Sequence, residues 1–296
     1  MKKLVRMLAI LGAIINLTVA KAQTPVRERH MPEATLTLRT TAEAHNADYV
    51  EADAMLMPKA EAQIGDAQVG YAGTFRKVVD SDGHTSDLQT FVNKLSFVND
   101  DWEVVVGRDV LRSFGGTTTT VGFDNWMSGN GLGRQYTGGF VGHHPSGLKL
   151  GLVSSDGEIG PRHLDTLMGT WSHQFDKLGV QVHGSATEDH LEKAGLALEW
   201  RPTDRLRLLA DGVYTRNGTA AMLAGNFALT DNVTLFAGSG VNAPENDSAT
   251  TRFVVGAEGN LGHGFKAIGA VEHEESSEPD TRVVVGVKFV GSGKLL

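Results

Sequence analysis

Apolar and polar residues alternate along most of this chain with a period of two. In one clear stretch Leu196, Leu198 and Trp200 share one parity, while Glu199 and Arg201 share the other. Successive side chains of a β-strand point to opposite faces, so this period predicts strands. The same pattern recurs over residues 206–214, 252–261, 265–274 and 283–289. We therefore predict antiparallel strands with one apolar face and one face of charged, glycine and small residues.

Short turn signals and longer polar stretches alternate between the predicted strands. The turn signals are residues 99–101, 144–147, 176–177, 202–204, 230–232 and 262–264, and the longer stretches are 80–87, 154–163, 187–192, 242–249 and 274–280. With four earlier strands expected at 34–44, 49–57, 67–76 and 88–98, about sixteen strands result, and both ends fall on the short-turn side. This pattern predicts an all-β fold, a transmembrane antiparallel β-barrel wide enough for an aqueous lumen.

Four aromatic residues strengthen the membrane interpretation. Trp102, Phe175, Trp200 and Phe265 lie beside the short turns, where an aromatic girdle at the membrane interface is expected. A soluble periplasmic β-sandwich produces the same alternation, with the aromatic residues capping its core, and stays open as an alternative.

The N-terminus has the features of a secretory signal peptide. Lys2, Lys3 and Arg6 precede the apolar run 8–19, and Ala20 and Ala22 give the small-x-small pattern of a cleavage site. The run is too short for a membrane-spanning helix, which needs about 20 apolar residues. We expect a signal peptide at 1–22, a periplasmic lead-in at 23–33 and the barrel at 34–296, in the outer membrane.

Charge and cysteine content exclude several functions. Removing residues 1–22 takes away four basic residues and no acidic one, so the formal net charge of −8 becomes −12. Such a chain repels phosphate backbones, so nucleic acid is not an expected partner. The chain has no cysteine, which excludes disulfides and thiolate metal sites. No cofactor and no metal are expected.

One long segment interrupts the alternation after the strand expected at 102–109. It runs from Ser113 to Arg134 and contains Phe114, Phe123 and Trp126. A loop of about 20 residues in a compact domain is usually functional or disordered. Its aromatic side chains need a surface to pack on, and the barrel interior is close.

Residues 103–108 read EVVVGR, residues 114–116 read FGG and residues 285–289 read VGVKF. In that order, these motifs resemble the fifth strand, the start of the third loop and the last strand of the general Gram-negative porins. The chain departs from the family where Ser113 replaces the usual acid and where residues 290–296 follow the final Phe289.

The resemblance implies a function and partners. It implies a homotrimeric porin for passive diffusion of small hydrophilic solutes and ions, in contact with outer-membrane lipid and lipopolysaccharide, and with its third loop folded toward the lumen. It also implies a pore constriction with acids on the loop opposite basic residues on the wall.

The candidate constriction residues follow from that analogy and from parity. Asp124 is the only acid of the loop, and Arg39, Arg76 and Lys94 have inward parity on the first, third and fourth strands. A field between them would select solutes by charge. Arg108 fits the family motif but has apolar parity, so a bulge or the strand end must redirect it. Alternatively, each residue merely lines a wet lumen.

Other motifs give no catalytic or metal site. His183 and Ser185 share the lumen-facing parity of one strand, but no acid or amide at useful spacing completes a triad. His143 and His144 are adjacent strand residues, which point to opposite faces. An enzyme is therefore not expected. The main alternative to a porin is a non-conducting outer-membrane barrel that acts as a structural anchor or adhesin, and a barrel enzyme is a more distant one.

Overall fold

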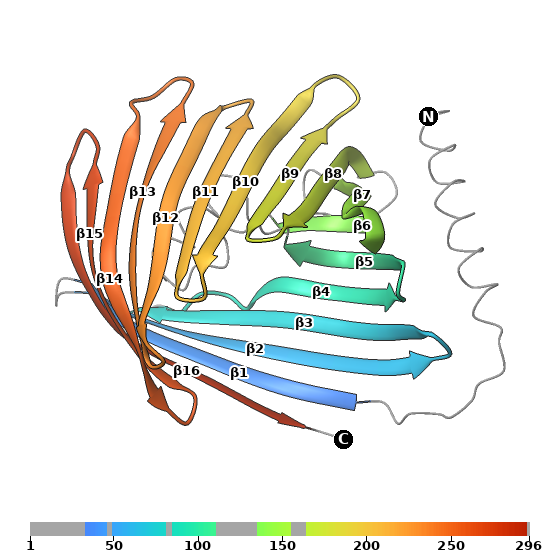
Figure 1. Ribbon diagram of the computed structural model, residues 1–296, viewed down its shortest axis with the longest axis horizontal. Helices are drawn as coiled ribbons and strands as arrows, with labels where there is room; N and C mark the ends of the chain where they lie inside the picture. Colours follow the sequence, from blue (N-terminus) through green and yellow to red (C-terminus); the bar gives the residue numbers. More distant parts are fainter. Residues whose placement is uncertain (1–32, 46–48, 81–84, 111–134, 155–163, 295–296) are drawn as a thin grey trace.

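The chain folds into one closed barrel of sixteen antiparallel strands, in which each strand pairs with its neighbours in sequence and β1 closes the sheet against β16 (Figure 1). The computed structural model describes residues 33–45, 49–80, 85–110, 135–154 and 164–294. The strands are β1 (Glu33–His45), β2 (Tyr49–Ile64), β3 (Ala67–Asp80), β4 (Gln89–Val98), β5 (Trp102–Val110), β6 (Gln135–His143), β7 (Leu148–Ser154), β8 (Leu164–Phe175), β9 (Leu178–Ala186), β10 (Leu191–Thr203), β11 (Leu206–Thr215), β12 (Gly218–Thr230), β13 (Val233–Pro244), β14 (Thr250–Gly262), β15 (Phe265–Glu275) and β16 (Asp280–Lys294).

The predicted fold class and strand number are confirmed. The segments 1–22 and most of 23–33, expected as signal peptide and lead-in, lie outside the described residues, and β1 already begins at Glu33. No helix within the described residues is long and apolar enough to cross a membrane.

The short turns lie where the sequence indicated, and the conformation of two of them has a local explanation. The Asn99 side-chain oxygen accepts hydrogen bonds from the backbone N–H groups of Asp101 (3.1 Å) and Trp102 (2.7 Å), which closes the β4–β5 turn. In the β6–β7 turn, Gly147 has φ +69°, and a Cβ there would lie 1.8 Å from the Ser172 carbonyl oxygen. Only glycine lets this turn lie against β8.

The opposite end of the barrel contains one tight hairpin for which no turn or loop was predicted. Only Arg216 and Asn217 connect β11 to β12. On the short-turn end, β10 continues through Pro202 to Thr203, and the register with β11 shifts there. Proline has no N–H for the ladder, which explains the irregularity.

Large apolar side chains cover the outer face of the barrel. Leu95 is 60% exposed, Leu223 63% and Val255 58%, and each has the parity that points away from the lumen. Trp102, Phe175, Trp200 and Phe265 are likewise exposed beside the short turns, as predicted. A soluble sandwich would bury its apolar face between two sheets. The closed barrel instead turns that face outward, which contradicts the sandwich alternative.

The end of β16 extends beyond the porin-like motif. Pairing with β15 reaches Phe289, opposite Phe265, and the two rings lie 4.8 Å apart. Pairing with β1 continues further, to Lys294 opposite Thr35. The described residues after Phe289 therefore lengthen the strand and close the barrel against β1.

Candidate functional site: the inner wall of the barrel

The register of the sheet shows which side chains share the inner face, because residues directly opposite each other on paired strands lie on the same face. Leu38 and Leu56 are opposite each other and exposed on the outside. Their neighbours along the chain, Arg39 and Met55, therefore point toward the lumen.

Three basic residues lie on one sector of this inner wall. Met55 of β2 pairs with Arg39 of β1 on one side and with Arg76 of β3 on the other, so the three form a row across neighbouring strands. Lys94 of β4 pairs with Ala72 of β3 and has the same inward parity. The structure thus places Arg39, Arg76 and Lys94 on the inward face of one sector, as the sequence parity indicated, although Lys94 lies opposite Ala72, four residues along β3 from Arg76. These three residues are called the basic row below. Arg39 Nε is buried without a hydrogen-bond partner among the described residues.

The other two candidate constriction residues are not part of this row. Arg108 lies on the same face of β5 as the exposed Val106, which is the outer face, as the sequence indicated. Its Nε donates to the Thr137 hydroxyl and its Nη1 to the Thr90 carbonyl, both at 3.4 Å. Gly107, just before it, has φ +129°. A place for Arg108 in the constriction stays a prediction, and Asp124 with the rest of the loop lies outside the described residues.

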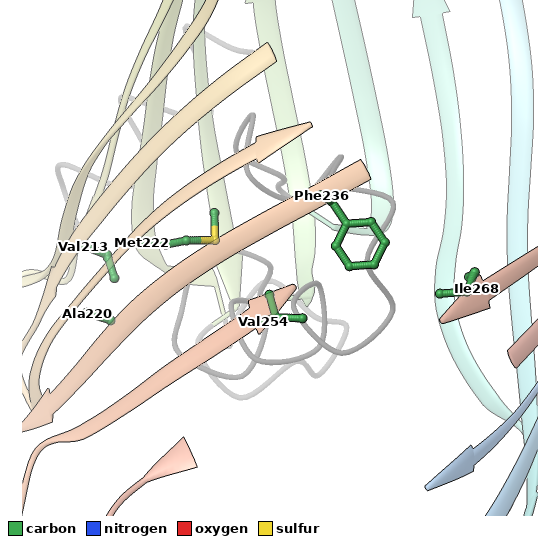
Figure 2. Close-up of a cluster of buried hydrophobic side chains, with 6 residues drawn as sticks. All are labelled: Val213, Ala220, Met222, Phe236, Val254 and Ile268. Atoms are coloured by element: carbon green, nitrogen blue, oxygen red, sulfur yellow. The ribbon is translucent and has the colours of Figure 1, made fainter. Parts of the chain in front are cut away.

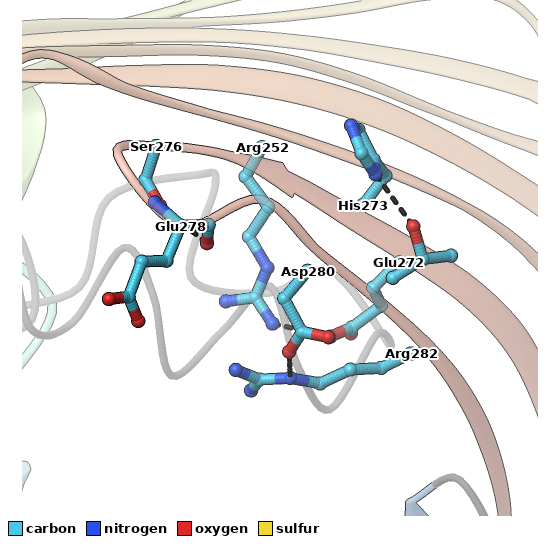
Figure 3. Close-up of polar contacts among 8 residues, drawn as sticks. Arg252, Glu272, His273, Ser276, Glu278, Asp280 and Arg282 are labelled. Atoms are coloured by element: carbon cyan, nitrogen blue, oxygen red, sulfur yellow. Dashed lines mark hydrogen bonds and ion pairs between the residues drawn. The ribbon is translucent and has the colours of Figure 1, made fainter.

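Across β10 to β16, the buried acidic side chains of Glu199, Glu258 and Glu272 lie beside basic ones. Glu199 accepts from Arg201 and, at 2.7 Å, from Arg207. Three further pairs on β14 to β16 are Arg252 with Glu272, Lys266 with Glu258, and Arg282 with Asp280. Figure 3 shows the Arg252 and Arg282 guanidinium groups directed at Glu272 and Asp280. Because cation and anion lie together, these pairs add little net charge to the wall.

The inner wall also carries two apolar clusters. One, on β11 to β15, consists of Val213, Ala220, Met222, Phe236, Val254 and Ile268 (Figure 2). The other, on β5 to β8, consists of Val105, Tyr136, Phe140 and Val153, with Met168 packed against them. Phe236 is 4% exposed and Met222 2%. The sequence analysis predicted an inner face of charged, glycine and small residues. This prediction is wrong in part, because large apolar side chains also lie on the inner face.

Glycines on adjacent strands make room for rings on the inner face. Phe236 pairs with Gly256, and Phe140 pairs with Gly151. A Cβ at Gly256 would lie 2.4 Å from the Phe236 ring, and one at Gly151 would lie 2.5 Å from the Phe140 ring. His183 lies against Gly195 in the same way, at 2.3 Å. Each ring therefore lies flat against the wall over a residue without a side chain.

This placement bears on the histidine motifs. His183 and Ser185 are buried on the inner face, and His183 Nε2 has no hydrogen-bond partner in the described part of the chain. Within the same residues, no group of three or more His, Asp or Glu side chains could hold a metal ion. His183 is a packed wall residue over Gly195.

Sequence reasoning missed the apolar clusters and the ring–glycine pairs. The segment 219–225 contains consecutive apolar and small residues, so its parity does not reveal that Met222 faces inward and Leu223 outward. A usable signal was present around Phe236, which shares its parity with Gly238 and Gly240. When a single aromatic residue shares its face of a strand with glycines, its ring is expected to lie flat against the backbone beside it.

A closed sixteen-stranded barrel with an apolar exterior and charged residues on its inner wall is the architecture of a porin. Neither a family model nor a curated protein sequence matches the chain significantly. Solved structures do match. A variant of the porin of Rhodopseudomonas blastica superposes with a TM-score of 0.59 at 15% identity, over 88% of this chain and 100% of the other.

Two further structures agree with this match. A second variant of that porin gives a TM-score of 0.57 at 15% identity, over 88% of this chain and 100% of the other. An engineered protein described for its asymmetric conductivity gives 0.58 at 13% identity, with the same coverage. At such identities the likeness establishes the fold of this chain, a porin-like barrel.

Proposed function

We propose that this protein is an outer-membrane porin that lets small hydrophilic solutes and ions diffuse through a water-filled barrel. The observation that carries the proposal is the two-sided closed sheet. Leu95, Leu223 and Val255 cover the outside with exposed apolar surface, which suits acyl chains. Arg39, Arg76 and Lys94 lie on the inside, which suits water and ions.

The comparisons support the same function. The matched structures are porin variants, and one matched protein is described for its conductivity. The signal peptide expected at 1–22 would deliver the chain to the periplasm, from which a barrel enters the outer membrane. A homotrimer in contact with lipopolysaccharide belongs to the same proposal, on the porin resemblance alone.

The row of basic residues gives the proposed channel its selectivity. Arg39, Arg76 and Lys94 lie on the inward face of β1, β3 and β4. We therefore assign these three residues to the pore constriction, with Asp124 and Arg108 as further candidates from the porin analogy. Basic residues on one side of a narrow pore favour anions over cations of similar size.

A non-conducting barrel is a second candidate, and one observation favours it. The inward clusters around Phe236 and Phe140 are almost completely buried, as are the inward carboxylates Glu258 and Glu272. Side chains on an open lumen would contact water. A barrel that is filled at this level would serve as a structural anchor or adhesin.

Single-channel recording in planar bilayers decides between the two candidates. Folded, purified protein should give stable open currents, and the absence of any current would leave the non-conducting barrel. Replacing the basic row, Arg39→Gln with Arg76→Gln and Lys94→Gln, should reduce the anion-to-cation permeability ratio about two- to fivefold. Arg205→Gln, in the exposed β10–β11 turn, is the matched control and should leave the ratio unchanged.

A further inference from the structure

A row of polar residues crosses the outer face of the barrel on β4 to β7. Asn93 of β4 lies opposite Arg108 of β5, Arg108 lies opposite Thr137 of β6, and Thr137 lies opposite Ser154 of β7. Residues opposite each other share a face, and Arg108 has the outward position of the exposed Val106. These four residues are called the polar row below.

The polar row lies at a depth where apolar side chains are expected. Arg108 lies six positions after Trp102 of the aromatic girdle. At about 3.3 Å per residue and a tilt of about 40°, its Cα lies roughly 15 Å from the girdle, within an apolar band about 25 Å tall. By contrast, the outward positions of β11 to β14, all within the described residues, carry no charged side chain.

The strands that carry the polar row are also short. β5 and β6 have 9 residues each and β7 has 7, whereas β12, β13 and β14 have 12 or 13. A strand that crosses a bilayer at a tilt of about 45° needs about 9–11 residues. The described length of β7 is therefore too short to match the lipid, and the polar row lies near the end of this low section of the wall.

Lipid is an unfavourable neighbour for this face. An arginine on the lipid side of a barrel costs about 2–4 kcal/mol near the midplane of the bilayer. The Arg108 guanidinium is held along the wall, because Nε donates to the Thr137 hydroxyl and Nη1 to the Thr90 carbonyl, both at 3.4 Å. A polar protein surface lowers the cost, because it supplies hydrogen bonds that acyl chains lack.

The same section of the wall carries the opposite charge on its other flank. Asp165, near the start of β8, has the outward parity of the exposed Leu167 and is itself exposed. Its carboxylate accepts a hydrogen bond from the Thr166 hydroxyl at 3.0 Å. β5 and β8 are three strands apart, which is about 14 Å at about 4.8 Å per strand. One patch therefore presents a cation and an anion side by side, as a head-to-tail contact between identical copies requires.

We propose that the polar row is the contact face between copies of this chain in a cyclic oligomer, with Arg108 of one copy facing Asp165 of the next. A head-to-tail contact closes into a ring when the rotation between copies fits. The proposal rests on the outer-membrane location of the proposed function and gives its homotrimer a contact face. It also assigns Arg108 to the outside of the barrel, in place of the constriction that the porin analogy implied.

Disulfide cross-linking tests the contact in the folded full-length protein, because the chain has no cysteine. Arg108→Cys combined with Asp165→Cys should give linked dimers and higher multimers after oxidation in lipid vesicles. Within one copy the two positions are too far apart, since a disulfide needs Cα atoms within about 7 Å. Leu223→Cys with Val255→Cys, at exposed outward positions, is the matched control and should not link copies. Equal linking in the control, or no multimers from the first pair, would overturn the proposal.

Charge reversal separates the contact from misfolding. Arg108→Asp should weaken assembly at least tenfold in a mild detergent, measured by light scattering over a concentration series, because two anions then face each other. Adding Asp165→Arg should restore assembly, since the pair is then reversed. Arg205→Gln, in the exposed β10–β11 turn, is the control and should assemble as the parent does.

Four results would contradict this contact face. They are a monomeric parent, normal assembly of Arg108→Asp, a folded double variant that does not regain assembly, and normal assembly of Arg108→Asp with loss of bound phospholipid in native mass spectrometry. The last result would assign the polar row to lipid instead.

Conductance on the same preparations keeps this inference separate from the proposed channel. Arg108→Gln should retain the anion-to-cation permeability ratio of the parent, because the side chain lies outside the lumen. A changed ratio with normal assembly would return Arg108 to the pore and overturn the contact face. Parent protein that assembles and cross-links as expected but does not conduct would refute the channel and leave the contact face intact.

Discussion

Replacing Gly256 by alanine tests whether the inner wall is packed as the ring–glycine pairs indicate. Gly256 lies on the inner face of β14, directly opposite Phe236 of β13. A Cβ at this position would lie 2.4 Å from Cζ of the Phe236 ring and 2.4 Å from the Gly269 carbonyl oxygen. Both distances are about 1 Å shorter than ordinary van der Waals contact. The ring and the backbone of β15 would have to move apart.

The magnitude follows from a comparison with a second glycine. Forcing an extra carbon into a packed site typically costs about 1–3 kcal/mol. Alanine also removes conformational freedom from the unfolded chain, which stabilises by about 0.4–1 kcal/mol wherever the site is open. Gly269, on the outer face of β15, has no described atom within 4 Å of its ideal Cβ. Because both substitutions share the entropy term, Gly256→Ala should be about 1–3 kcal/mol less stable than Gly269→Ala.

The assay is reversible urea unfolding from lipid vesicles, followed by tryptophan fluorescence and extrapolated to zero denaturant. Adding Phe236→Ala to Gly256→Ala separates the two clashes. A ring clash should disappear in the double variant, whereas a clash with the Gly269 carbonyl should remain. If Gly256→Ala and Gly269→Ala differ by less than about 0.5 kcal/mol, the tight packing of Phe236 over Gly256 is wrong.

Three further predictions concern the wall and the closing strand. Lys266→Met removes the ion-pair partner of the buried Glu258 carboxylate and should lower the free energy of unfolding by about 1–3 kcal/mol in the same assay. The control Lys59→Met removes an exposed ion pair and should change the free energy of unfolding by about zero. Deleting residues 290–296 removes the last β16–β1 pairs and should slow folding into vesicles, measured as a delayed gel shift of the unboiled protein. Unchanged folding kinetics would show that these pairs form after the barrel closes. Because the chain has no cysteine, the variants Met55→Cys and Val254→Cys can each be labelled at a single position. An anionic methanethiosulfonate should react much faster at position 55 than at the buried position 254, and equal reaction rates would contradict the burial of Val254.

The outer half of this fold was predictable from the sequence, because a membrane imposes a strict rule on one face. In the proposed membrane location each outward residue would meet acyl chains, which explains why Leu196, Leu198 and Trp200 are apolar at every second position. Turn residues such as Asn99 marked the hairpins and hence the strand number. The tight connection at Arg216 and Asn217 was missed, since neither residue differs from those of an ordinary polar loop.

The inner half was only partly predictable, because no comparable rule acts on it. A lumen accepts charged, small or apolar residues, provided that buried polar groups find partners. Parity therefore placed Arg39, Arg76 and Lys94 inside, yet it could not show that Met55 joins two of them in one row. Nor could it show which carboxylates are paired, since Glu258 meets Lys266 across two strands through the register alone.

The uneven inner wall bears directly on the path that solutes would take. On β11 to β15 the inward surface is apolar and buried around Phe236, and its carboxylates Glu258 and Glu272 lie beside cations. On β1 to β4 the inward surface carries the basic row and is partly exposed. Water and ions follow polar, accessible surface, because a desolvated ion at an apolar wall is costly. The proposed channel would therefore run along β1 to β4, which makes its selectivity depend on Arg39, Arg76 and Lys94.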